Sequence, residues 1–189
     1  MPKFFELCLD DVASVREKVA LHSTASILHS FLGSDYLKEF INQMKEFKES
    51  NRYNFRQSFV CMIESIFLDF CESSTDLIKE IVLPNFMQDL LDISMDRVVN
   101  VRIQLAECFY HFYKKFEGIQ SSNEHKEKTM FYLNRHFFKI LRNLKYDPSE
   151  GVREFLYNIE VSFNETVSED LNNSSPSKVV VEMISSQDS

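Results

Sequence analysis

The sequence predicts an all-α fold, built from about four stacked helical pairs and followed by a disordered tail. The first observation is the scarcity of turn residues, because 189 residues include only 3 glycines and 4 prolines. A many-stranded sheet needs more of them, since most hairpin turns require residues that tolerate positive φ. The second observation is that apolar residues recur at steps of three and four, and the third is a motif that repeats along the chain.

The charge balance and the apolar runs narrow the class of protein. Lys and Arg number 21 against 29 Asp and Glu, which gives a formal net charge of -8. Proteins that bind nucleic acid concentrate basic residues on one face, and no such cluster occurs here. The longest apolar runs fall far short of the roughly 20 residues that span a bilayer. Acidic residues interrupt the apolar start of the chain, so we expect no signal peptide. We therefore expect a cytoplasmic or nuclear protein that binds neither nucleic acid nor membrane.

The repeated motif is Asp, four residues, then Val-Arg. It occurs at residues 10–16, 96–102 and 147–153, and a degenerate copy at 50–56 has Ser50 for Asp and Phe55 for Val. The motif arginines at 16, 56, 102 and 153 are 40, 46 and 51 residues apart. Repeats made of helical pairs have periods of roughly 40 to 47 residues. The longest interval contains a polar run at 117–126, which we interpret as a lengthened loop.

An apolar stripe with helical spacing follows each motif copy. These stripes predict the second helix of each pair, over 12–31, 52–72, 97–116 and 148–165, lying in parallel succession along one side. The first helices are expected over 36–48, 75–94 and 126–145, with Pro84 kinking the middle one. The phenylalanines on these helices are assigned to the core. Only residues 2–9 precede the first motif, so the opening pair lacks most of its first helix.

Residues at the expected helix ends agree with this division. Asp147 is a candidate N-cap, with Pro148 at the first helical position and Glu150 in the place of a capping-box acid. Gly33 and Gly118 follow two second helices, where a left-handed closing residue is expected.

The composition divides the chain in two. Residues 1–166 are expected to form the helical array, and residues 167–189 a disordered, Ser-rich acidic tail. The tail cannot bury enough apolar area to offset the entropy lost on ordering. The run Val179-Val180-Val181 within it is a candidate docking strand.

The Asp and Arg of the motif suggest a structural ladder. In stacked pairs, each arginine can reach the aspartate of its own or an adjoining turn and form a charge-assisted hydrogen bond. Direct contact with a partner is the alternative role. The residues assigned to the ladder are Arg16, Arg56, Arg102, Arg153, Asp10, Asp96 and Asp147.

Two longer stretches carry a resemblance to a known family. The motif and the helix pairing resemble HEAT repeats. Residues 51–59, followed by Leu83-Pro84 and then by residues 96–102, look like the carboxy-terminal repeats of the scaffolding A subunit of protein phosphatase 2A. The HEAT-type regulatory subunits of protein phosphatase 4 are similar. The resemblance covers roughly residues 1–165, and residues 83–106 are its most specific part.

The resemblance implies a non-catalytic scaffold without a cofactor. Its partner would be the catalytic subunit of a serine/threonine phosphatase of the 2A/4 group, and further regulatory subunits could join the complex. In that family the ridge of turns between first and second helices holds the catalytic subunit. The residues that map to this ridge are Asp10, Asp11, Asn51, Arg52, Tyr53, Asp96, Arg97, Pro148 and Glu150.

Catalytic and metal-binding motifs are missing from the sequence. The five histidines form no HExxH motif, and neither a GxSxG motif nor a glycine-rich phosphate loop occurs. The four cysteines, at positions 8, 61, 71 and 108, form no CxxC pair and are interpreted as buried free thiols. We therefore expect no enzyme activity, no catalytic residue and no metal site.

Two other functions remain open at this point. A HEAT adaptor of another kind, such as a transport receptor or an assembly factor, would grip an extended peptide on its concave face. A small helical enzyme would need a cleft with perturbed ionisable groups, and the sequence offers no such set of residues.

Overall fold

The computed structural model describes residues 2–71, 76–118, 135–157 and 159. Every regular element in these ranges is a helix, and none is a strand, so the prediction of an all-α protein is confirmed. The expected tail, residues 167–189, and the expected loop from residue 119 to 126 lie outside the described residues.

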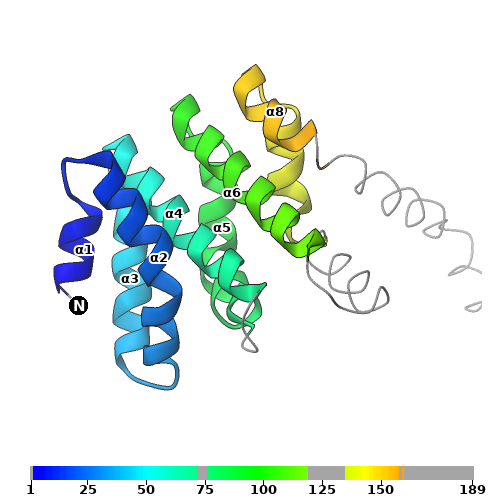
Figure 1. The fold of residues 1–189 in the computed structure, drawn as a ribbon. Helices are drawn as coiled ribbons and strands as arrows, with labels where there is room; N and C mark the ends of the chain where they lie inside the picture. Colours follow the sequence, from blue (N-terminus) through cyan, green and yellow to red (C-terminus); the bar gives the residue numbers. More distant parts are fainter. Residues whose placement is uncertain (1, 72–75, 119–134, 158, 160–189) are drawn as a thin grey trace, which may run out of the picture.

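The described helices follow one another along the chain (Figure 1). Their bounds are α1 Pro2–Cys8, α2 Ala13–Phe31, α3 Tyr36–Glu49, α4 Tyr53–Phe70, the π-helical turn η1 Ile78–Val82, α5 Leu83–Ile93, α6 Val99–Glu117, an unlabelled helix over 135–145, and α8 Glu150–Tyr157.

The expected helices are found within one or two residues where the chain is described. The four second helices correspond to α2, α4, α6 and α8, each starting one or two residues after its expected first residue. The first helices correspond to α3, to η1 with α5, and to the helix over 135–145. The opening helix α1 has 7 residues against 14 in α3. Residues 126–134 and 160–165 lie outside the described ranges.

The first helix expected over 75–94 is irregular at a different position from the one predicted. We predicted that Pro84 kinks a continuous helix, but Pro84 instead lies in the first turn of α5, where its missing amide proton costs little. The irregularity precedes it as the π-helical turn η1, in which the amide of Leu83 donates to the carbonyl of Ile78. The side-chain amide of Asn85 donates to the carbonyl of Ile81 at 2.9 Å and so satisfies one backbone acceptor at the junction.

Two of the expected helix ends were wrong. Asp147 is not the N-cap of α8, because the helix starts at Glu150 and the Asp147 carboxylate accepts from the amide of Ser149 in the preceding turn. Gly118 has φ of -74°, an ordinary right-handed value, because its amide continues the hydrogen bonding of α6 to Lys115 and Phe116. Gly33 has φ of +75°, as expected for a left-handed closing residue.

The long helices pack in sequence order. Helix α2 packs on α4, α4 on α6, and α6 on α8, while α3 packs behind α4 (Figure 1). Phe67 of α4 links three helices, because its ring centroid lies 5.1 Å from that of Phe112 and 5.4 Å from that of Phe137. One apolar core therefore runs continuously through the helices.

Most of the phenylalanine and cysteine assignments hold. Phe40, Phe59, Phe86 and Phe137 are among the fully buried side chains, but Phe138 is 41% exposed, contrary to its assignment to the core. All four cysteines are free, as expected, and all but the half-buried Cys71 are buried.

The two helix-closing glycines provide a matched pair of substitutions. Gly33→Ala should destabilise the fold by about 1 kcal/mol, because an L-residue with a side chain is strained at positive φ. Gly118→Ala should leave stability within about 0.5 kcal/mol of the wild type, because its backbone suits any residue. Urea unfolding followed by circular dichroism measures both, and equal destabilisation by the two variants would contradict the assignment.

Candidate functional site

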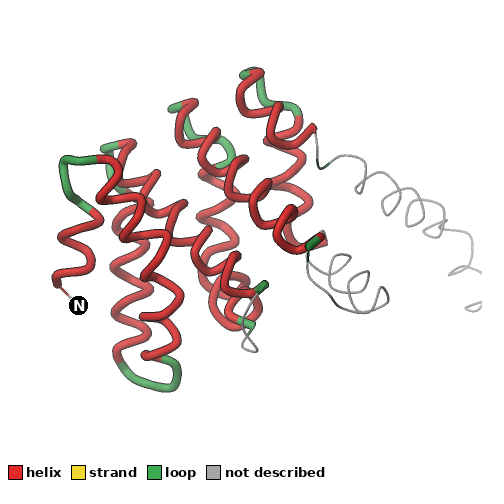
Figure 2. The backbone as a smooth tube through the Cα atoms, viewed as in Figure 1, coloured by secondary structure: helices red, strands yellow, loops and turns green. Residues whose placement is uncertain are grey.

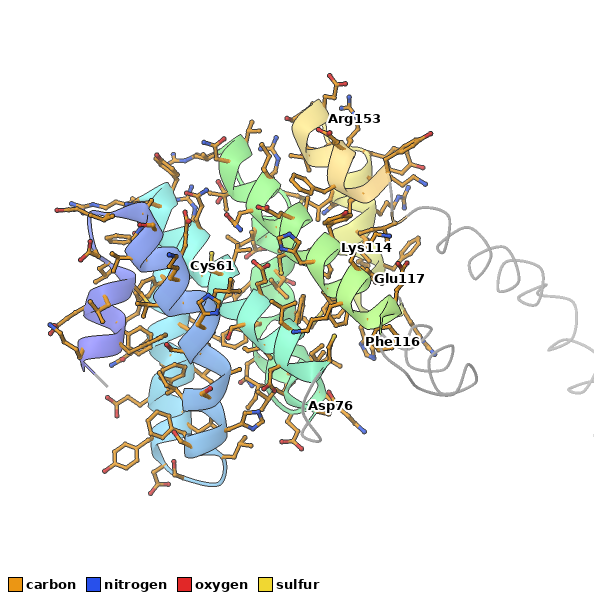
Figure 3. The ribbon with its side chains drawn as sticks, viewed as in Figure 1. Cys61, Asp76, Lys114, Phe116, Glu117 and Arg153 are labelled. Atoms are coloured by element: carbon orange, nitrogen blue, oxygen red, sulfur yellow. The ribbon has the colours of Figure 1, made fainter. Side chains whose placement is uncertain are left out.

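The four motif copies lie in four turns at one edge of the molecule. The turns precede α2, α4, α6 and α8, and they all lie at the upper edge in Figure 2. Figure 3 shows Arg153 at this edge, whereas Lys114 and Glu117 lie toward the other end of α6. We call this set of turns, residues 9–13, 49–53, 94–99 and 146–150, the turn edge.

Each turn is closed by its own motif residues. The first residue of the motif accepts a hydrogen bond from the amide two positions later, at 2.8 Å in Asp10, Asp96 and Asp147 and at 3.2 Å in Ser50. This is an Asx turn, or its serine equivalent, which bends the chain before a helix. The motif arginine, six positions on, donates back to the carbonyl of that first residue in all four copies.

Two of the four motif arginines also join neighbouring turns. Arg56 donates to both oxygens of Asp96, from Nε at 2.5 Å and from Nη2 at 2.9 Å. Arg102 pairs in the same way with Asp147, at 2.5 and 3.1 Å. The side chains in both pairs are at most 11% exposed, so these are bidentate, largely desolvated ion pairs. Each guanidinium thus holds its own turn and the aspartate of the next turn.

The chain of pairs is interrupted in the degenerate copy. Arg16 donates to the carbonyls of Asp10 and Asp11, at 2.7 and 3.0 Å, and forms no ion pair with any described residue. The next turn offers the hydroxyl of Ser50 where the other copies offer a carboxylate. Of the residues assigned to the ladder, Arg56, Asp96, Arg102 and Asp147 form inter-turn pairs, whereas Arg16, Arg153 and Asp10 act within their own turns.

The pairing keeps the aspartates charged. Burial is the largest influence on Asp96 and acts to raise its pKa, but hydrogen bonds from Arg56 and the Val98 amide, with the charge of Arg56, hold the pKa below its usual range. The pKa of Asp147 is lowered in the same way, with burial opposed by Arg102 and the Ser149 amide. Both carboxylates therefore need a lower pH for protonation in the folded protein than in the unfolded chain.

Other polar links join the long helices away from the turn edge. His29 of α2 lies 2.8 Å from Asp69 of α4, and Nδ1 of His111 in α6 lies 2.7 Å from the buried Glu64 of α4. Burial raises the pKa of Glu64 more than His111 lowers it. The sequence analysis missed these links, because the partners are 40 and 47 residues apart and no short-range pattern marks them.

The ridge residues inferred from the resemblance lie at the turn edge, but they differ in exposure. Asp11, Asn51, Arg52, Tyr53, Arg97, Pro148 and Glu150 are exposed. Asp10 is half-buried, and Asp96 has a side chain only 8% exposed and held by Arg56. A partner can reach the first seven residues directly, whereas Asp96 shapes the turn and is unsuited to direct contact.

The turn edge also collects exposed apolar side chains, of which only Tyr53 belongs to the ridge expected from the sequence. Nine large apolar side chains are exposed among the described residues, and six of them lie in the four turns. These six are Leu9, Val12, Tyr53, Met95, Val99 and Tyr146. A sequence signal existed, because a large apolar residue directly precedes the motif Asp in three of the four copies, at positions 9, 95 and 146. Clustered exposed apolar side chains mark interaction surfaces in folded proteins.

The described residues show no sign of an activated nucleophile. Burial raises the pKa of Cys8 to about 12 and raises those of Cys61 and Cys108 as well, so these thiols stay protonated at neutral pH. Among these residues there is no group of three or more metal-ligating side chains. None of the described helices combines the length and the apolar character that crossing a bilayer requires.

The interruption at Ser50 leads to a test of the ladder. Ser50→Asp should stabilise the protein by about 1 kcal/mol, because it supplies the carboxylate that Arg16 lacks. Urea unfolding at neutral pH measures the gain. Ser50→Asn is the matched control, since it keeps the turn geometry without the charge. The gain should disappear when Arg16→Ala is also present, and a gain that survives Arg16→Ala would contradict the pairing.

The lowered pKa of Asp147 leads to a test by pH. Asp147→Asn should cost about 3 kcal/mol at pH 7, because it leaves the guanidinium of Arg102 buried without its counter-charge. A carboxylate with a depressed folded pKa contributes its full stability above its unfolded pKa of about 3.9 and loses it as the pH falls further. The difference between wild type and variant, measured by urea unfolding from pH 7 to pH 3, should therefore shrink below about pH 4. A constant difference would contradict the charge pairing.

No protein-family model, no curated protein and no solved structure matches the chain. The function proposed below therefore rests on the motif, on the geometry of the four turns and on the exposure of their side chains.

Proposed function

We propose that the chain is an α-solenoid of HEAT-type helical pairs that serves as a non-catalytic scaffold or regulatory subunit. Its partner would be the catalytic subunit of a serine/threonine protein phosphatase of the 2A/4 group, bound along the turn edge. The resemblance of residues 51–59 and 83–106 to the scaffolding subunits of that group supports the choice of partner. The succession of α2, α4, α6 and α8 along one side supports the solenoid.

The observation that carries the proposal is the concentration of exposed apolar side chains at the turn edge. Six of the nine exposed large apolar side chains of the described residues gather there, beside the exposed guanidiniums of Arg52 and Arg97. Interfaces typically combine apolar and aromatic anchors with arginine, because these groups bind strongly once water is excluded. The other three, Tyr36, Phe138 and Tyr157, lie toward the opposite ends of their helices, on three different elements.

The ladder gives this surface a defined shape. Since Arg56 and Arg102 each close their own turn and hold the next one, bidentate pairs rather than flexible loops set the spacing of the last three turns. A partner spanning several turns would then meet anchors whose positions are already ordered, which reduces the entropy lost on binding. Small changes at each interface between helical pairs would add up along the array and alter how the bound enzyme is presented.

A scaffold also agrees better with the chemistry of the described residues than an enzyme does. The buried thiols have raised pKa values, and the two partly buried His-carboxylate contacts join neighbouring helices. The chain would contribute position and selectivity, and the partner would contribute the catalysis.

Charge reversal at the turn edge tests the proposal. The double variant Arg52→Glu and Arg97→Glu should reduce co-purification of the phosphatase catalytic subunit about tenfold or more, because about 1.4 kcal/mol of lost binding free energy gives one factor of ten. Its helical content should stay at the wild-type level, since both side chains are exposed and form no ion pair with a described residue.

A matched control separates the turn edge from net charge. Lys38→Glu with Arg135→Glu makes the same charge change at exposed positions near the starts of α3 and of the helix over 135–145, away from the turn edge. It should leave co-purification unchanged. Equal losses in the two double variants would argue against the turn edge as the binding surface. Recovery of transport or assembly factors in place of a phosphatase would favour the alternative adaptor function.

A further inference from the structure

A hollow lies between the last two turns of the turn edge. Its volume is about 620 Å³, and it is lined by the turn before α6, the turn before α8 and the end of the helix over 135–145. The lining residues that matter for its chemistry are Met95, Arg97, Arg102, Arg142, Tyr146 and Asp147.

The hollow carries unbalanced positive charge. Its two aspartates are already neutralised, since Asp147 pairs with Arg102 and Asp96 pairs with Arg56. Arg97 and Arg142 are exposed, and neither guanidinium has a hydrogen bond or an ion pair within the described ranges. The whole chain has a formal net charge of -8, so this is a local positive site on an acidic protein.

Large apolar side chains stand beside these two arginines. Met95 is 62% exposed and Tyr146 is 70% exposed, and each directly precedes the aspartate of its motif copy. The hollow therefore suits an extended segment that offers a carboxylate flanked by apolar side chains on both sides. The carboxylate would lie between two guanidiniums, and the apolar groups would cover Met95 and Tyr146.

We propose that residues 179–184 of the same chain, Val-Val-Val-Glu-Met-Ile, occupy this hollow. Beyond residue 166, Glu182 is the one carboxylate with an apolar residue on each side. The run 179–181 is also the longest apolar run in the chain after residue 159. The charge and the apolar character of the segment thus match those of the hollow, and the proposal places Glu182 opposite Arg97 and Arg142.

The length of the connecting chain permits this contact. Helix α8 starts beside the hollow at Glu150 and extends over 8 residues, about 12 Å at the helical rise. From Ile159, 19 residues lead to Val179, and an extended chain of that length spans about 60 Å. A tethered segment within reach of its site has an effective concentration of up to about the millimolar range. Weak individual contacts are therefore sufficient for occupancy.

Occupancy would regulate access to the turn edge. The docked segment would cover Met95, Arg97 and Tyr146, three of the exposed side chains that a partner could use. A partner that binds at these side chains would have to displace the segment. The contact does not depend on which protein binds the turn edge, so its test is independent of the proposed phosphatase partner.

Photo-crosslinking in the full chain tests the contact. A benzoylphenylalanine crosslinker replaces Ile184, and crosslinked peptides are located by mass spectrometry after irradiation at low protein concentration. Crosslinks should fall on residues 94–98 and 142–148. Glu182→Lys and Arg142→Glu should each lower their yield about fivefold, which corresponds to loss of an ion pair of about 1 kcal/mol. Combining Arg142→Glu with Glu182→Arg should restore at least half of the yield.

The controls make the outcome decisive. Arg135→Glu changes an exposed charge two turns earlier in the helix that carries Arg142 and should leave the yield unchanged. Circular dichroism checks that each variant keeps its helical content. The proposal would be overturned by crosslinks to other parts of the chain or by crosslinks between two copies. It would also be overturned by yields that do not change with the charge of residues 142 and 182.

Discussion

The arrangement of the turns depends on Arg56 and Arg102, because each of these guanidiniums binds groups of two different turns. In the second and third motif copies the arginine donates to a carbonyl of its own turn and, through its other nitrogens, to both oxygens of the next aspartate. Lysine could not replace it, because a single ammonium lacks the planar fork that serves a carboxylate and a carbonyl together. The closure of each of these turns and its distance from the next turn therefore depend on the same arginine. Removing that arginine would affect both.

This coupling explains how apolar side chains can stay exposed at the turn edge. The backbone polar groups of each turn are already satisfied by the motif Asp and Arg, so the turn needs no apolar packing to hold its shape. The side chains of Met95 and Tyr146, which directly precede motif aspartates, form none of the hydrogen bonds that close these turns, and both are exposed. Their exposure costs little within the fold and makes them available for contact with another segment.

The period of the apolar stripes was enough to predict the helices, because helical periodicity is a short-range pattern. The recurring Asp and Arg marked the residues of the ladder, but which of them pair between turns could not be predicted, because the paired residues are 40 and 45 positions apart. The expected Asp147 cap and the left-handed Gly118 were wrong, because hydrogen bonds to Ser149 and Lys115 decide those ends and residue type alone cannot reveal them. The hollow beside Arg142 could not be predicted, since it needs three segments brought together. The choice of partner stays a prediction, because residue chemistry describes a surface and many proteins can fit one surface.

The degenerate copy suggests that the interfaces between helical units are unequal in stiffness. The turns before α4 and α6 are joined by a bidentate ion pair, whereas Arg16, at the start of α2, forms no ion pair with any described residue. The link from α4 toward the turn before α2 is a neutral hydrogen bond, since the hydroxyl of Ser58 in α4 donates to the carbonyl of Cys8 at the end of α1, at 3.1 Å. A neutral hydrogen bond resists displacement less than a desolvated bidentate pair does. At the turn edge, relative movement should therefore be easier between the turns before α2 and α4, while the turns around Arg56 and Arg102 move together. These coupled turns contain both exposed arginines of the proposed interface and most of the lining of the hollow.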